Sequence, residues 1–271
     1  MLKSEHGARA AGMGGAFVSI AADPNAAAYN PAGAGGVNKF TASFGHTTYW
    51  ENIRLESGYV AANLLSRLYV HGGIRFAVID NIENRQLPTL EPDDFSDAHD
   101  VSFKGGLAYR FTERVTAGLA AGWFVEKIGG WRGSVFNVDL GVQTTPRENV
   151  SLGASVTNLG SDFNLEMTGI VGSRDISLPT TYRFGGSYRY ESYLGAIDLV
   201  VLDDKLHIHA GAEAQLHELF QLRGGYMFNY DSKSFTAGAS FTKRNLTIDY
   251  AFVPYSNDLG TSHMFNFTFK L

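Results

Sequence analysis

The sequence predicts an all-β protein, a transmembrane antiparallel β-barrel of about 14 strands with an N-terminal plug segment in its lumen. Beyond residue 38, segments of roughly ten residues alternate apolar and polar side chains, as barrel strands do. Tight connections alternate with longer ones, and aromatic residues gather near segment ends, as at the two membrane interfaces. We therefore expect a plug over residues 1–37 and a barrel over residues 38–271.

The composition excludes several classes of protein. The 271 residues include no cysteine, which rules out disulfides and thiolate metal sites. A net charge of −5 without a basic stripe argues against nucleic acid as a partner. No apolar run reaches the ~20 residues of a membrane helix, but barrel strands do not need one. Residues 1–6 are too short and polar to be a signal peptide, so we expect an outer-membrane protein whose signal is absent from this chain.

The predicted plug is the small, glycine-rich stretch Gly7–Gly36. Helix formation at its start is opposed by three glycines, Gly12, Gly14 and Gly15. Asp23 can cap a short helix that has Pro24 at its first position. That helix should end at Asn30, because the following Pro31 disfavours the α conformation there. The predicted result is a compact, irregular segment that packs inside the barrel.

The strands follow in order after the plug. We predict them at 38–49, 53–63, 67–78, 100–111, 114–126, 132–144, 149–158, 180–190, 193–202, 206–216, 219–229, 233–243, 245–253 and 262–271. In the last of these, Phe265, Phe267 and Phe269 share one face. A soluble sandwich also alternates, so this pattern alone does not decide the class.

The lengths of the connections favour the membrane barrel. Counted from the first strand, every even-numbered connection is tight, and the long ones are all odd-numbered: 79–99, 159–179 and 254–261. Outer-membrane barrels have short turns on one side and long loops on the other, whereas a sandwich has no reason to sort its loops in this way.

Three segments resemble one family of barrels. They are Tyr29-Asn30-Pro31-Ala32-Gly33, the pair Val156–Gly160 and Leu178–Gly186, and the ending Asp249–His263. Together they resemble the PorV/PorQ-type outer-membrane proteins, distant relatives of the FadL fatty-acid channels. The resemblance implies a barrel of about fourteen strands whose N-terminal segment fills part of the lumen. It also implies a role beside the type IX secretion system, with a protein partner in that assembly.

Two groups of polar residues invite a metal-site interpretation. His207, His209 and Glu213 share one face of a strand and are competent metal ligands, or they are polar residues lining a lumen. The acidic stretch 91–100 could bind calcium, but it lacks EF-hand spacing, and a solvated loop is the favoured interpretation. We expect no metal and no cofactor. The sequence also lacks a phosphate-binding loop and a G-x-S-x-G elbow, so we expect no enzyme.

The long connection at 161–177 is unusually apolar. Its candidate partner-contact residues are Phe163, Leu165, Met167 and Ile170. These side chains either dock on a partner or fold inward over the lumen.

Three functions remain open at this point. The leading hypothesis is an accessory barrel of the PorV/PorQ type, surrounded by outer-membrane lipid and docked on a secretion or surface assembly. The alternatives are a FadL-like passive channel for hydrophobic solutes and a structural anchor for a surface layer or appendage. A kinked strand or lateral gap beside the plug would favour the channel, and a co-purified partner would favour the docking role.

Overall fold

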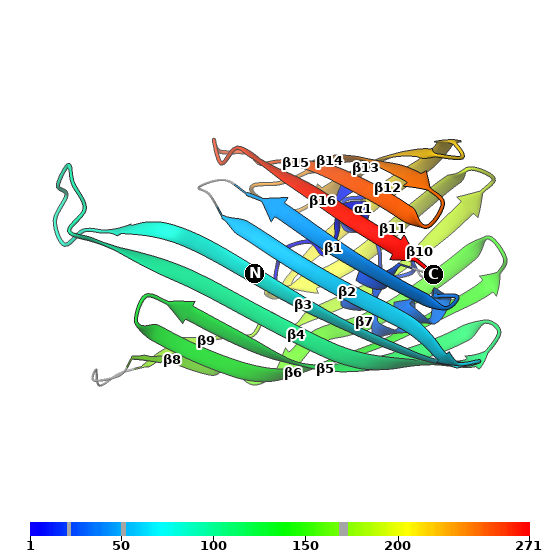
Figure 1. Cartoon of the computed structure of the whole chain (residues 1–271), viewed down its shortest axis with the longest axis horizontal. Helices are drawn as coiled ribbons and strands as arrows, with labels where there is room; N and C mark the ends of the chain where they lie inside the picture. Colours follow the sequence, from blue (N-terminus) through cyan, green and yellow to red (C-terminus); the bar gives the residue numbers. More distant parts are fainter. Residues whose placement is uncertain (21–22, 50–52, 168–172) are drawn as a thin grey trace.

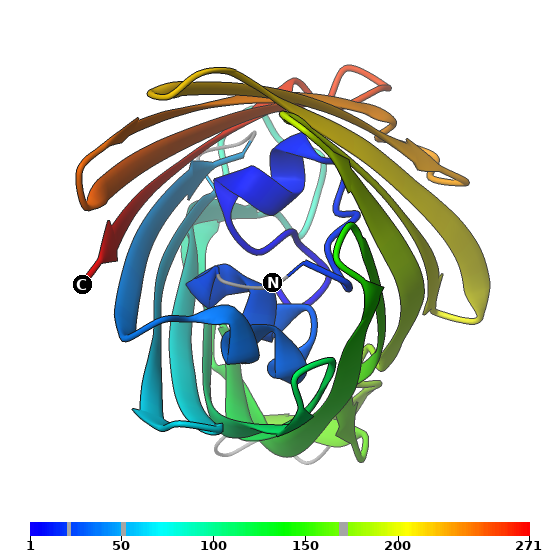
Figure 2. The ribbon, with the colours of Figure 1, turned by 90° about the vertical axis from the view of Figure 1, so that its right-hand side faces the viewer.

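The computed structural model describes residues 1–20, 23–49, 53–167 and 173–271 and consists of a closed antiparallel barrel around an N-terminal segment (Figure 1, Figure 2). Fourteen strands form the wall, which confirms the predicted fold class. In chain order they are β1 (Phe40–Thr48), β2 (Arg54–Leu65), β3 (Leu68–Asn84), β4 (Asp94–Thr112), β5 (Val115–Ile128), β6 (Trp131–Arg147), β7 (Val150–Gly160), β10 (Thr181–Tyr190), β11 (Tyr193–Leu202), β12 (Lys205–His217), β13 (Phe220–Phe228), β14 (Phe235–Lys243), β15 (Leu246–Pro254) and β16 (Thr261–Lys270).

The barrel closes between its first and last strands. β1 pairs with β16 on one side and with β2 on the other. Every wall strand has two paired neighbours, so the wall has no free edge along which chains could aggregate. Two-residue turns join the strands at one end of the barrel, and the long β3–β4 hairpin projects from the other end (Figure 1). The sorting of short and long connections is therefore as the sequence predicts.

Two of the three predicted long loops contain more strand than expected. β3 and β4 extend into the stretch 79–99, as far as the pair Asn84 and Asp94. A bulge interrupts their register between Ile79 and Ile82, where Asn81 has a φ of 59°. Because a bulge shifts the side-chain alternation, the continuation does not show as a period of two in the sequence. In the stretch 159–179, a hairpin is formed by β8 (Phe163–Met167) and β9 (Ser173–Ile176).

The faces of the wall follow the predicted alternation. In β16, Phe265, Phe267 and Phe269 point outward with 41–44% of their surface exposed, while Met264 and Thr268 are buried toward the lumen. Apolar residues thus face outward and polar ones inward, the arrangement of a barrel in lipid rather than of a soluble sandwich.

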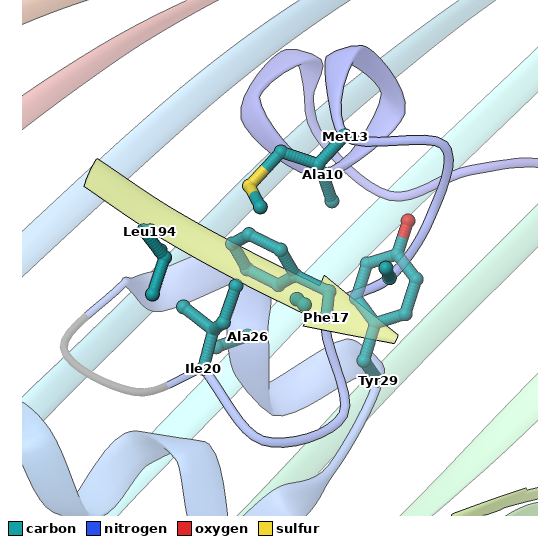
Figure 3. Packing of buried hydrophobic residues seen from close by; sticks show 9 residues of the cluster. Ala10, Met13, Phe17, Ile20, Ala26, Tyr29 and Leu194 are labelled. Carbon is teal, nitrogen blue, oxygen red and sulfur yellow. The ribbon is translucent and has the colours of Figure 1, made fainter. Parts of the chain in front are cut away.

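The N-terminal segment packs apolar residues against the wall in three buried clusters. It contains α1 (Ala8–Gly12) and two 3₁₀ helices, η1 (Pro24–Ala28) and η2 (Pro31–Gly36), all inside the barrel (Figure 2). Phe17 packs tilted on Tyr29 with ring centroids 5.5 Å apart, and both belong to a cluster that reaches Leu194 of the wall (Figure 3). Among the described residues, no helix is long and apolar enough to cross a membrane.

Candidate functional site

The irregular backbone of the plug is held by polar side chains of the wall. The carboxylate of Asp198, which is fully buried, accepts hydrogen bonds from the backbone N–H groups of Phe17 (2.7 Å) and Val18 (2.9 Å). The amide nitrogen of Gln143 donates to the carbonyl oxygens of Val18 (2.9 Å) and Ile20 (3.1 Å). Buried backbone groups outside regular helices need such partners. Wall side chains therefore fix this part of the plug in one position.

Asn30 links the two halves of the plug to the wall. Its side-chain oxygen accepts a hydrogen bond from the backbone N–H of Ala32 (3.1 Å), which caps η2, and Pro31 is the first residue of that helix. Its amide nitrogen donates to the carbonyl oxygens of Val18 (2.9 Å) and Val142 (3.0 Å). One fully buried amide thus joins η2, the plug backbone and β6, a role that aspartate cannot perform because it has no N–H to donate.

Two of the predicted plug glycines have backbone conformations and surroundings that exclude side chains. Gly14 and Gly15 have φ of 63° and 73°, a region that favours glycine. A Cβ atom at Gly14 would lie 2.8 Å from the backbone nitrogen of Tyr226, and one at Gly15 would lie 2.7 Å from Nδ1 of His209. The plug therefore contacts the wall directly at both positions.

The remaining predicted plug residues have local roles. Asp23 accepts a hydrogen bond from the backbone N–H of Asn25 (2.9 Å) and caps η1, in which Pro24 is the first residue. Gly12 lies against the side chain of Arg223, and Gly33 lies against Ala26, so each also permits a close approach.

A balanced group of charges joins α1 to the wall. Arg9 binds Glu213 through two hydrogen bonds, Nε to Oε2 at 3.0 Å and Nη2 to Oε1 at 2.9 Å. Arg223 forms ion pairs with the same Glu213 (3.3 Å) and with Asp249 (2.9 Å), and Asp23 lies 3.7 Å from Arg9. Two arginines thus face three carboxylates, and each charge has an opposite neighbour. We call these five residues the balanced cluster.

The three weak metal-ligand candidates do not converge. His207 stacks on the ring of Tyr230 at 3.9 Å, and Nε2 of His209 lies 2.9 Å from the Tyr230 hydroxyl. Glu213 is occupied by Arg9 and Arg223. Within the described residues, no group of three or more histidine or carboxylate side chains could hold a metal ion. The three residues line the lumen as polar side chains.

The predicted acidic loop 91–100 is mostly strand, because β4 begins at Asp94. Its carboxylates are used separately: Asp93 accepts the backbone N–H of Gln86 (2.7 Å), and Asp97 accepts that of Asn81 (3.2 Å). These two carboxylates stabilise the bent end of the β3–β4 hairpin.

In the described part of the apolar stretch 161–177, two of the candidate residues fold inward instead of presenting an exposed patch. Phe163 and Leu165 are only 6% and 2% exposed, and they pack with Phe124, Val135 and Leu178 on the lumen side of the wall. Two further candidates differ: Met167 ends β8 and lies against Gly130, and Ile170 falls outside the described residues. Phe163 and Leu165 therefore form part of a lid near the mouth of the barrel.

Beneath this lid, a small cavity lined by both apolar and charged residues lies between the plug and the wall. Its volume is about 40 Å³, and its charged side chains come from four different strands. Arg75, Lys104 and Arg183 are cations, and Asp139 is the carboxylate. Lys104 Nζ lies 2.7 Å from both oxygens of Asp139. We call these four residues the cation cluster.

The wall is interrupted beside this cavity. β7 pairs with β10 up to Thr157 and Thr181, and the same hairpin resumes between Phe163 of β8 and Ile176 of β9. Between these points the described residues form no β-bridges across the hairpin, and Asn158 has a φ of 58°. The side chain of Leu178, 7% exposed, packs here against the lid. The chain thus has a kinked pair of strands next to the plug, with Thr157, Asn158 and Thr181 lining the cavity.

No protein-family model and no curated protein sequence matches this chain. Solved structures do match. The Pseudomonas putida toluene transporter TodX has a TM-score of 0.73 at 13% identity, covering 98% of each chain. The monoaromatic hydrocarbon channel CymD has a TM-score of 0.73 at 12% identity, covering 98% of this chain and 97% of that one. A Pseudomonas aeruginosa FadL homologue has a TM-score of 0.60 at 10% identity, covering 98% of each chain.

The chain has the FadL-type barrel fold. This agrees with the FadL side of the predicted resemblance, while membership of the PorV/PorQ group is not confirmed. At such low identity the likeness establishes the fold alone. The likeness to these barrels covers the closed fourteen-stranded wall.

Sequence reasoning missed the cation cluster and the interruption of the wall. The cluster draws on β3, β4, β6 and β10, so it exists only once the register of the whole barrel is known. One weak sign of the interruption is present in the sequence, the pair Leu178-Pro179 directly before the strand predicted at 180–190. Proline lacks an N–H and is tolerated where strand pairing is broken.

Proposed function

We propose that the protein is an outer-membrane channel that lets small hydrophobic solutes pass passively, in the manner of a FadL-like barrel. The observation that carries this proposal is the interruption between β7 and β10, because it adjoins the internal cavity. The solved channels of the same fold support it. A hydrophobic solute that enters past the lid would leave sideways into lipid at this point, without crossing the polar plug.

The position of the interruption along the strand suits such an exit. Asn158 is the ninth residue of β7, counted from Val150 beside a tight turn. Because a tilted strand crosses the bilayer in about 9–11 residues, the interruption lies near the far edge of the hydrocarbon region. The Leu178 side chain covers it from within, in contact distance of Gly160.

A reversible cross-link tests the exit. Asn158 and Thr180 face each other just beyond the last ladder pair, and the Thr180 hydroxyl donates to the carbonyl oxygen of Asn158 at 3.0 Å. This hydrogen bond places the two residues side by side, so a disulfide between cysteines at these positions would join the strands across the interruption. The double variant Asn158→Cys/Thr180→Cys introduces the first two cysteines of the chain. We expect toluene uptake by cells lacking their own FadL-type channels to fall when the bond forms and to recover on reduction.

A matched disulfide in the intact ladder provides the control. Ser151 and Ser187 are paired in the same two strands, nearer the tight turns. Oxidation of Ser151→Cys/Ser187→Cys should leave uptake unchanged. Leu178→Ala should raise uptake, because it removes the side chain that covers the interruption. If cells that contain the reduced protein take up no more toluene than cells that lack it, the channel proposal is wrong.

An accessory or anchoring barrel is the second candidate, and the filled lumen favours it. The plug occupies the interior, and the cavity beside it holds only about 40 Å³. In this case the protein would act through its outer surface, with a partner in a PorV/PorQ-like secretion or surface assembly. Native membranes should then yield a stoichiometric companion on affinity purification, and toluene uptake should be absent.

A further inference from the structure

The charges around the internal cavity do not cancel. Lys104 uses both oxygens of Asp139, the carboxylate of the cation cluster. Arg75 and Arg183 have no carboxylate within ion-pair distance among the described residues. Arg75 is only 3% exposed. Arg183 is half-buried. A buried charge without a counter-charge is costly, so Arg75 above all needs a further partner.

Arg75 is surrounded by neutral groups of the plug. Its Nη2 donates to the hydroxyl of Ser4 (2.7 Å) and to the carbonyl oxygen of Glu5 (3.2 Å), while its buried Nε has no hydrogen-bond partner. The carboxylate of Glu5 is not available to it, because Glu5 pairs with Lys233.

Arg183 is similarly incomplete. Its Nη1 donates to the hydroxyl of Thr157 at 3.3 Å, and its guanidinium lies over the ring of Tyr29 at 5.3 Å. Its Nε is buried without a hydrogen-bond partner, as is Nε2 of His71, which also lines the cavity. Three unpartnered nitrogen atoms therefore belong to side chains that surround one small space.

The pKa of His6, a plug residue that lines the cavity, indicates the sign of the electrostatic potential there. Burial lowers the pKa of its imidazole well below the usual value, and the positive charges of Arg75, Arg183 and Lys104 lower the pKa further. Its Nδ1 lies 2.8 Å from the Tyr59 hydroxyl. His6 thus stays neutral near pH 7, and the surroundings favour a negative charge.

We propose that the cavity binds one small oxyanion between Arg75 and Arg183, beside Lys104, whose ammonium already donates to Asp139 and Asn158. A planar guanidinium suits the oxygens of phosphate, sulfate or a carboxylate, and such bonds are strong when both partners are charged. A volume of about 40 Å³ suits a group of a few atoms. The anion would supply the counter-charge that the chain itself lacks.

Such an anion would also join the plug to the wall. Arg75, Lys104 and Arg183 belong to β3, β4 and β10, whereas His6 and Ala27 of the plug line the opposite side of the cavity. Binding in this cavity would stabilise the closed barrel by mass action. The site does not depend on solute transport, so it can be present whether or not the proposed channel function holds.

Thermal unfolding of the whole purified protein in detergent tests the site, with inorganic phosphate as the probe at constant ionic strength set by sodium chloride, which is not an oxyanion. We expect Tm to rise by roughly 2–5 °C for each tenfold increase above the dissociation constant. Arg183→Gln should abolish the rise. Arg189→Gln is the matched control, because Arg189 is an exposed arginine of the same strand outside the cavity, and it should keep the rise.

A second variant supplies the charge internally. Ser102 is buried in the cavity and directly opposite Arg75 in the β3–β4 ladder. Ser102→Asp places a carboxylate beside the unpaired guanidinium. This variant should unfold at a higher temperature than the wild type without phosphate and should gain little when phosphate is added. It keeps the test decisive even if Arg183→Gln folds poorly.

The source of the oxyanion is resolved by a parallel titration with octanoate. Stabilisation by phosphate identifies a free anion, and stabilisation by octanoate alone identifies the head group of an amphiphile; both require loss of the effect in Ser102→Asp. If neither probe raises Tm, or if Ser102→Asp responds as the wild type does, the site does not exist.

Discussion

The balanced cluster and the cation cluster lie in the same lumen but differ in how their charges are satisfied. Arg9 and Arg223 share Glu213 and have Asp23 and Asp249 beside them. In the cation cluster, Asp139 is taken by Lys104, and the two arginines rely on neutral partners. In the first arrangement every charge has an opposite charge within 4 Å, although Arg223 Nε has no hydrogen-bond partner, and the cluster fixes α1 to the wall. The second is complete only with a ligand, which is why we assign binding to it.

The largest effect should follow from breaking the balanced cluster at its centre. Glu213→Ala leaves Arg9 and Arg223 buried next to each other with fewer partners, and removing one member of a buried pair costs about 3–5 kcal/mol. The free energy of unfolding, measured in urea with lipid present, should fall by that amount. Glu218→Ala, an exposed residue at the next tight turn, is the control and should change it by less than about 0.5 kcal/mol. Equal losses in the two variants would show that the cluster does not hold the plug.

Much of the barrel could be predicted from the sequence because apolar and polar side chains alternate along its strands with a period of two. Phe265 and Phe267 alternate with Asn266 and Thr268, and the structure orients them outward and inward accordingly. The alternation did not predict the strands correctly where its period of two is broken. Asn81 and Asn158 have left-handed φ values that change the face on which the following residues lie. The sequence pattern therefore did not predict the extended end of β3 or the kink at Asn158 in β7.

The charged clusters could not be predicted for a different reason. Arg75 and Arg183 are more than a hundred residues apart, and each looks like an ordinary lumen residue in its own strand. Only the pairing of successive strands brings both to one cavity. The inward fold of Phe163 and Leu165 likewise depends on the packing of β8 against Phe124 and Val135.

A smaller expected effect is the pH dependence of the unfolding free energy that arises from His6, which lies beside the cation cluster. The pKa of His6 is depressed in the folded protein, so the unfolded chain binds a proton that the folded chain does not. The stabilisation is therefore present above the unfolded pKa of about 6.5 and is lost as pH falls below it, with a limiting slope of about 1.4 kcal/mol per pH unit. His6→Asn can keep a hydrogen bond to the Tyr59 hydroxyl and has no proton to gain. The difference in unfolding free energy between wild type and His6→Asn should thus shrink on acidification from pH 7 to pH 5, and a constant difference would show that His6 does not sense the cluster.

The smallest effect distinguishes the two clusters most clearly. Arg183→Gln removes a contact with Tyr29 and a hydrogen bond to Thr157, but it also relieves repulsion from Arg75 and Lys104. The lost contacts are worth about 0.5–2 kcal/mol together, and the relief offsets them, so stability without phosphate should change by less than about 1 kcal/mol.

The matching substitution in the balanced cluster should behave differently. Arg223→Gln leaves Glu213 and Asp249 buried with fewer cations, and it should cost about 3 kcal/mol or more. Urea unfolding of both variants in phosphate-free buffer measures the contrast. If Arg183→Gln proves as costly as Arg223→Gln, the guanidinium of Arg183 already has a sufficient counter-charge in the chain, and the cavity has no need of an anion.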